Sequence, residues 1–125
     1  MSSVLKCKIG YNKYGAYCVP DSAINRPAAD LVKAGDVYEP DTIEFMANNC
    51  GDGDIIHAGT FFGDFLPALS KAIATDRFIW AFEPNLESYR CAKITCELNQ
   101  IENVKLHHAG SVSYTHLTLP TTPYV

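Results

Sequence analysis

The sequence predicts an α/β protein whose strands form part of a doubly wound, Rossmann-like parallel sheet. Three short apolar segments, at residues 54–59, 77–85 and 103–110, have the length and the β-branched or aromatic content of buried strands. The two segments between them have the apolar spacing of helices. Strand, helix, strand, helix, strand is the order that builds one half of such a fold. Right-handed crossovers then predict the strand order 3-2-1.

The first 50 residues predict a hairpin followed by two helices. Turn-forming residues at positions 12–15 separate the segments KCKIGY and AYCVP, which favours a β-hairpin. Pro27 suits the start of a short helix and Gly35 its end. Pro40 opens a second helix that ends in the terminator NNCGDG. We interpret residues 1–50 as an N-terminal accessory segment.

The next segment, residues 51–110, contains the predicted strands and two further helices. Pro67 is placed where a first helical turn tolerates proline, and Asn85 is placed to cap the following helix. That second helix is expected to turn three apolar residues to one side: Cys91, Ile94 and Leu98. We interpret residues 51–110 as the cofactor-binding half of a larger domain.

Two glycines and one acid mark the expected ligand site. Gly59 and Gly63 bracket the turn after the first strand, where the backbone must turn sharply and a ligand can approach. Glu83 ends the second strand, 24 residues after Gly59, where a carboxylate can accept hydrogen bonds from both ribose hydroxyls. The turn therefore predicts a bound nucleoside.

The residues inside the turn discriminate between cofactors. A nicotinamide dinucleotide fingerprint needs a middle glycine close to the pyrophosphate, but Thr60, Phe61 and Phe62 occupy this turn. S-adenosylmethionine (SAM), a nucleoside without phosphates, fits better. The candidate cofactor-binding residues are His57, Gly59, Thr60, Phe61, Gly63, Asp64, Glu83, Pro84 and Asn85.

Several nearby side chains have alternative interpretations. Asp64 is equally well explained as a first-turn acid that complements the helix dipole and as a contact to the cofactor tail. His107 and His108 face opposite ways on a strand, so a shared metal ion is disfavoured and no metal site is predicted. Phe61, Phe62 and Phe65 are explained either as a wall over the cofactor or as core residues, with the core favoured, and Trp80 is assigned to the core.

Composition excludes some classes of function. A net charge of -4 without any basic run disfavours nucleic acid as a partner, and no apolar run approaches the length of a membrane span. No secretory signal is recognised, so a cytoplasmic location is expected. Five cysteines without a CxxC pair favour reduced thiols, with a Cys7–Cys18 bridge as the alternative in an oxidising compartment.

Four segments resemble the FkbM family of SAM-dependent methyltransferases: NKYGAYCVP, RPAADLVKAGDVYEPDTIEFM, GDIIHAGTFFGDFLPALS and WAFEPNLESYRCAKITCELNQIENVKLHHAG. The resemblance implies the first half of a class I methyltransferase fold, with SAM held by the turn of Gly59 to Gly63 and by Glu83. It also implies transfer to a hydroxyl of a sugar or small metabolite. His57 departs from the family, because class I methyltransferases usually carry an acid at this strand end.

Residues 111–125 differ from the rest of the chain. Every Lys, Arg, Asp and Glu precedes Ser111, and VSYTHLTLPT matches one reading frame of a transposase-based sequencing adapter. We interpret residues 111–125 as translated adapter rather than native sequence, and expect the chain as given to be inactive. No catalytic base is identified. The alternatives to a methyltransferase are an NAD(P)-dependent oxidoreductase and a non-catalytic Rossmann-like binding module.

Overall fold

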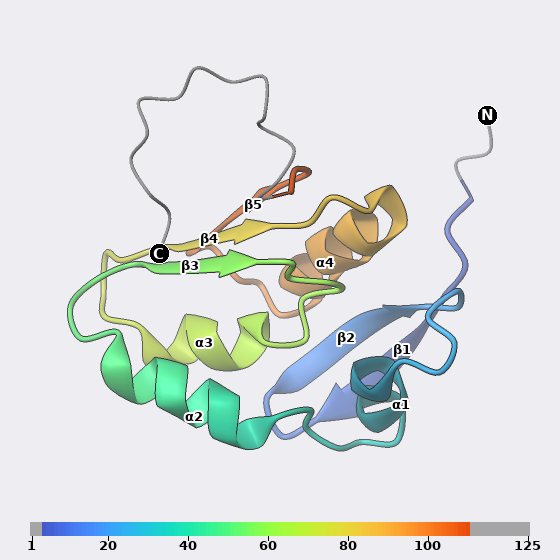
Figure 1. Ribbon diagram of the computed structural model, residues 1–125, viewed down its shortest axis with the longest axis horizontal. Coiled ribbons are helices and arrows are strands. Elements are labelled where there is room, and N and C mark those ends of the chain that lie inside the picture. Colours follow the sequence, from blue (N-terminus) through green and yellow to red (C-terminus); the bar gives the residue numbers. More distant parts are fainter. Residues whose placement is uncertain (1–3, 111–125) are drawn as a thin grey trace.

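The computed structural model describes residues 4–110, so the interpretation of residues 111–125 lies outside the described part (Figure 1). The elements are β1 (Cys7–Asn12), β2 (Gly15–Pro20), α1 (Pro27–Lys33), α2 (Pro40–Asn49), β3 (Ile55–Ala58), α3 (Leu66–Ala72), β4 (Ile79–Phe82), α4 (Leu86–Leu98) and β5 (Val104–His107). Each predicted strand and helix is present, with its ends within a few residues of the predicted ones.

The strands β3, β4 and β5 form a parallel sheet in that spatial order. Ile55 pairs with Ile79, and Ile79 with Val104. The first strand therefore lies at one edge and the third at the other, which confirms the predicted order. All three strands end at the same side of the sheet, so the turns that follow them meet there.

The helices around the parallel sheet pack against one of its faces. Ile43 of α2 and several side chains of α3 form a core with Ile55, Ile79 and Ala81 (Figure 1). The opposite face carries Ile56, which is 41% exposed, together with the exposed residues of β5. Within residues 4–110, this face has no helix packed on it.

The assignment of Trp80 to the core is wrong. Trp80 alternates with the buried residues Ile79 and Ala81, so its ring lies on the other face of the sheet and is only half-buried. The indole Nε1 donates a hydrogen bond to Asp54 Oδ2 at 2.8 Å, and the ring stacks on His107. The size of the ring favoured a core position, whereas the alternation of the strand places Trp80 on the opposite face from Ile79 and Ala81.

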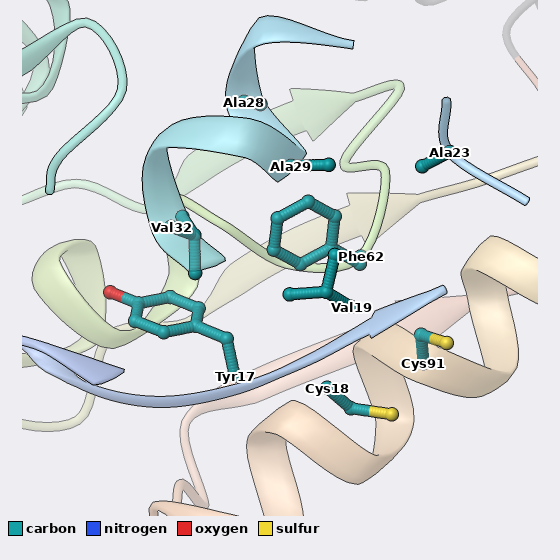
Figure 2. Close-up of a cluster of buried hydrophobic side chains, with 9 residues drawn as sticks. All are labelled: Tyr17, Cys18, Val19, Ala23, Ala28, Ala29, Val32, Phe62 and Cys91. Atoms are coloured by element: carbon teal, nitrogen blue, oxygen red, sulfur yellow. The ribbon is translucent and has the colours of Figure 1, made fainter. Parts of the chain in front are cut away.

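The hairpin β1–β2 packs against α4. The backbone amide of Cys18 donates to Thr95 Oγ1 at 3.0 Å, and Asn99 exchanges two hydrogen bonds with the backbone of Ala16. A second core lies between the hairpin, α1 and α4, as Figure 2 shows. Phe62, from the turn after β3, is fully buried in it. The N-terminal segment is thereby packed directly on the candidate site.

The buried face of α4 is rotated from the predicted one. Leu98 is 45% exposed, whereas the buried residues of this helix are Ser88, Cys91, Ala92 and Thr95. The hairpin causes the difference, because β2 contacts α4 along Thr95 and needs small side chains there.

The five cysteines are free. Cys7 is opposite Pro20 and Cys18 opposite Ile9 in the hairpin, so the two cysteines are diagonal neighbours on one face, and their thiols are close enough to interact. Burial raises the pKa of both Cys91 and Cys96 to about 11, which keeps these thiols protonated and unreactive.

No helix among residues 4–110 combines the length and the apolar character needed to cross a membrane.

Candidate functional site

The turn after β3 is tied to the end of β4. The amides of Gly59 and Thr60 both donate to the carbonyl of Phe82, at 2.8 and 2.9 Å, and the amide of Gly63 donates to the carbonyl of Thr60 at 2.8 Å. Helix α3 begins only at Leu66, so the turn is longer than the sequence indicated. The backbone of the turn is therefore held mainly by hydrogen bonds to the end of β4.

The two glycines of the turn have different roles. Both have positive φ, +70° at Gly59 and +85° at Gly63, as the predicted sharp turn requires. A Cβ at Gly63 would lie 3.3 Å from Leu66 Cδ1 and 3.5 Å from the Cα of Ala92, so this glycine permits close packing on α4. A Cβ at Gly59 would meet nothing within 4 Å. Gly59 is the glycine that leaves room for a ligand.

The Glu83 carboxylate joins the turns after β3 and β4. Its Oε1 accepts from the amide of Phe61 at 2.7 Å, and its Oε2 accepts from the amide of Asn85 at 2.9 Å. The residue is only 7% exposed. A carboxylate has about four lone-pair positions, so about two remain for ligand hydroxyls.

Glu83 faces a cavity of about 430 Å³ at the carboxyl edge of the sheet. Its lining residues come from both halves of the described chain: Pro20, Ser22, Ala23, Ile24, Arg26, Gly59, Phe61, Glu83, Pro84, Asn85 and Ser88. Asn85 caps α4, because its Oδ1 accepts from the amide of Ser88 at 2.9 Å. Five predicted residues, Gly59, Phe61, Glu83, Pro84 and Asn85, thus meet around one space of a size that suits a nucleoside.

A second cavity of about 260 Å³ adjoins the first. Both are lined by Arg26, Gly59 and Phe61, and the Arg26 guanidinium lies 4.1 Å from the centre of the Phe61 ring. The second cavity also contains His57, Asp64, Tyr38 and Glu39 among its lining residues. We name it the Arg26–Asp64 cavity.

Burial changes the titration of two residues in the Arg26–Asp64 cavity. It lowers the pKa of His57 to about 4, so the imidazole is neutral at pH 7. His57 Nδ1 shares a hydrogen bond with Thr60 Oγ1 at 2.8 Å, and the ring stacks on Phe65. Burial, and secondarily the nearby Glu39, raise the pKa of Asp64 to about 7. The cavity therefore contains an acid that ionises near neutral pH.

Some predicted residues do not face the cavities. Phe62 is buried in one core and lines neither cavity, and the side chain of Thr60 is fully buried against His57. Phe65 is buried in the other core, so the assignment of both rings to the core is confirmed, but Phe65 also lines the Arg26–Asp64 cavity. Phe61 instead lines both cavities. His107 stacks on Phe82, whereas His108 stacks on Tyr89 and donates to the carbonyl of Pro84.

Residues 4–110 contain no group of three His, Cys, Asp or Glu side chains arranged to hold a metal ion. The cavity residues that were not predicted include four polar residues of the N-terminal segment: Ser22, Arg26, Tyr38 and Glu39. Their spacing carries no signal of this role, since only the packing of the hairpin on α4 brings them to the turn. The positive φ of Glu39 and Phe61, +50° and +57°, is likewise a property of the folded chain.

Comparison with known proteins identifies the fold. No family model and no curated protein sequence matches the chain. Solved structures that match include M. jannaschii TYW2 in complex with AdoMet, which is SAM (16% identity, TM-score 0.57, 87% of this chain and 46% of that one). Another is aTrm5 in complex with tRNALeu (13%, 0.56, 87% and 29%). A third is a SAM-dependent O-methyltransferase from Thermotoga maritima (20%, 0.52, 81% and 40%).

These structures confirm the predicted fold class, an α/β Rossmann-like fold of the kind found in SAM-dependent methyltransferases. The chain spans less than half the length of each of the three.

Proposed function

We propose that the protein binds SAM at the carboxyl edge of its sheet and belongs to a methyltransferase that acts on a hydroxyl group of a sugar or small metabolite. The observation that carries the proposal is the Glu83 carboxylate, held by two backbone amides at the wall of a 430 Å³ cavity. The presence of AdoMet in the structurally similar TYW2 supports the same cofactor.

In this proposal the ribose hydroxyls donate to the remaining lone pairs of Glu83. The adenine lies further into the 430 Å³ cavity, beside Pro84 and Asn85. The sulfonium end passes Gly59, where the missing side chain leaves space. SAM supplies the electrophilic methyl group, and the protein's own residues hold the nucleoside in place for an incoming hydroxyl.

The hydrogen bonds of the turn argue against the runner-up, a nicotinamide dinucleotide. A pyrophosphate needs backbone amides that are free to donate. Here the amides of Gly59 and Thr60 donate to Phe82, that of Phe61 to Glu83 and that of Gly63 to Thr60. Four donors that a dinucleotide would use are thus already engaged.

Isothermal titration of the purified protein with SAM and with NADH tests the proposal. We expect binding of SAM alone, and we expect the Glu83→Gln variant to lose it. Binding of NADH alone would establish the oxidoreductase alternative. A folded protein that binds neither ligand would support the non-catalytic module instead.

The acceptor is tested separately, because the hydroxyl assignment comes from the FkbM resemblance. Because the chain as given is expected to be inactive, the full-length methyltransferase that contains it is incubated with SAM carrying a radiolabelled methyl group and with either a pool of sugars and small metabolites or total tRNA. The tRNA arm is included because the structurally similar aTrm5 was solved with tRNALeu. We expect label in the small-molecule fraction; label in tRNA would overturn the acceptor class and leave SAM binding in place.

A further inference from the structure

The Arg26–Asp64 cavity brings opposite charges together from distant parts of the chain. Arg26 immediately precedes α1, Glu39 immediately precedes α2, and Asp64 lies in the turn after β3. All three line the cavity of about 260 Å³ that adjoins the proposed nucleoside site. A ligand with both a positive and a negative group therefore finds complementary charges there.

These charges are not neutralised by one another at contact distance. The ion pairs formed within residues 4–110 are Lys8–Asp21 and Arg77–Asp54, both outside this cavity. Arg26 instead lies over the ring of Phe61. The Asp64 carboxyl is hydrogen-bonded to its own backbone amide, and its burial raises its pKa to about 7. A cation bound in the cavity would favour the ionised form of Asp64.

The strand-end position that usually supplies an acid in class I methyltransferases is His57 in this chain. Its half-buried imidazole is neutral at pH 7 and is hydrogen-bonded to Thr60, so it offers no negative charge to an ammonium group. Asp64 and Glu39 are the acids that line the same cavity. They are placed to provide the charge that His57 lacks.

We propose that the Arg26–Asp64 cavity binds the amino-acid end of SAM, with Asp64 and Glu39 accepting hydrogen bonds from its ammonium group and Arg26 donating to its carboxylate. The inference rests on the proposed function, because it assumes a nucleoside at Glu83. The shared wall of Gly59 and Phe61 gives one ligand a continuous path through both cavities. It makes the N-terminal segment a part of the binding site.

The test compares SAM with a ligand that lacks that end and also the positive charge that the sulfonium gives to SAM. 5′-Methylthioadenosine has the nucleoside and the thioether but no amino-acid group. Binding of both ligands is measured for the wild type and for Asp64→Asn, Glu39→Gln and Arg26→Met. We expect each substitution to weaken SAM about 10-fold or more and to leave 5′-methylthioadenosine unchanged, because charge-assisted hydrogen bonds are lost only to SAM.

The matched control is Asp41→Asn, which removes one negative charge from the exposed first turn of α2 without touching the cavity. It is expected to leave both affinities unchanged. Unaltered binding of 5′-methylthioadenosine also shows that a variant is folded. If the three variants bind both ligands as the wild type does, or lose both to the same degree, the inference is overturned and nucleoside binding stands. If the wild type binds neither ligand, the proposed function fails.

Discussion

Two carboxylates at opposite ends of the parallel sheet have the same hydrogen-bonding role in different surroundings. Glu83, just after β4, accepts from the amides of Phe61 and Asn85. Asp54, just before β3, accepts from the amide of Phe78 and the indole of Trp80. Each fastens two segments together. Glu83 is nearly buried at a cavity wall, whereas Asp54 is exposed and also forms a surface ion pair with Arg77.

The comparison extends to the cavities at the two ends. The larger one, about 540 Å³, lies at the amino end among the loops that follow α3 and α4. It is open and lined by loop residues such as Asp76, Arg77 and Glu102. The carboxyl end has smaller spaces but brings together the buried Glu83, the half-buried Asp64, an arginine over an aromatic ring and the open space at Gly59. Convergence of polar groups, rather than volume, therefore marks the site.

The largest difference is expected between Glu83→Gln and Asp54→Asn. The amide of glutamine cannot accept at both positions and has no charge for the ribose hydroxyls. We expect Glu83→Gln to weaken SAM binding roughly 1000-fold, about 4 kcal/mol. Asp54→Asn should lower the melting temperature and leave the SAM affinity unchanged. Calorimetric titration of both variants checks this; equal losses of affinity would refute the contrast between the two ends.

Two residues at the carboxyl end, His57 and Asp64, should make the free energy of unfolding depend on pH in opposite directions. The pKa of His57 is lowered to about 4, so its contribution to stability is complete above pH 6.5 and is lost as pH falls towards 4. The pKa of Asp64 is raised to about 7, so its contribution is complete below its ordinary pKa and is lost as pH rises through 7. The two effects oppose each other between pH 4 and pH 7.

Replacing either His57 or Asp64 should reveal the pH dependence of stability that the other residue contributes. Relative to the wild type, His57→Gln should gain about 2–3 kcal/mol of unfolding free energy on going from pH 7 to pH 4, and Asp64→Asn should lose a similar amount. Urea titrations at both pH values measure it. Asp54→Asn is the control, because the hydrogen bonds from Trp80 and Phe78 lower the pKa of Asp54. Its effect on the pH dependence of stability should therefore be opposite in sign to that of Asp64→Asn. Parallel pH profiles for all three variants would contradict the burial argument.

A smaller difference, in the stability lost on substitution by alanine, is expected between Gly63 and Gly51. Both have positive φ, but a Cβ at Gly63 would crowd Leu66 and Ala92, while one at Gly51, before β3, would meet nothing within 4 Å. Gly63→Ala should cost about 2 kcal/mol and Gly51→Ala about 1 kcal/mol, since only the backbone strain is common to both. Chemical denaturation compares them. An equal cost would mean that the packing of the turn on α4 is not tight.

The smallest effect is expected for two asparagines. Asn85→Ala removes the cap of α4 and should cost about 1 kcal/mol. It should also weaken SAM binding slightly, because the backbone amide of residue 85 donates to Glu83 and is held less firmly once the cap is lost. Asn103→Ala, at the amino end, removes a bond to the carbonyl of Ser70 and should change stability alone. A change in SAM affinity for Asn103→Ala would argue against a site confined to the carboxyl end.

The sequence by itself determined the order and type of the elements and the main wall of the site. The apolar runs of β3, β4 and β5, the proline and glycine positions and the Asn85 cap are local signals, and each acts within a few residues. Glu83 was also predictable, because a residue that ends a strand of a parallel sheet must lie at the shared edge.

The tertiary structure alone decided which surfaces are buried and which distant residues join the site. Alternation showed that Trp80 and Ile79 face opposite ways, but only the packing of α2 and α3 determined which of the two faces became the core. In the same way, the hairpin turned α4 so that Leu98 is exposed. Arg26 and Glu39 reach the turn only through this packing. The physical reason is that hydrophobic periodicity sets a repeat along the chain, whereas burial depends on the partner that covers it.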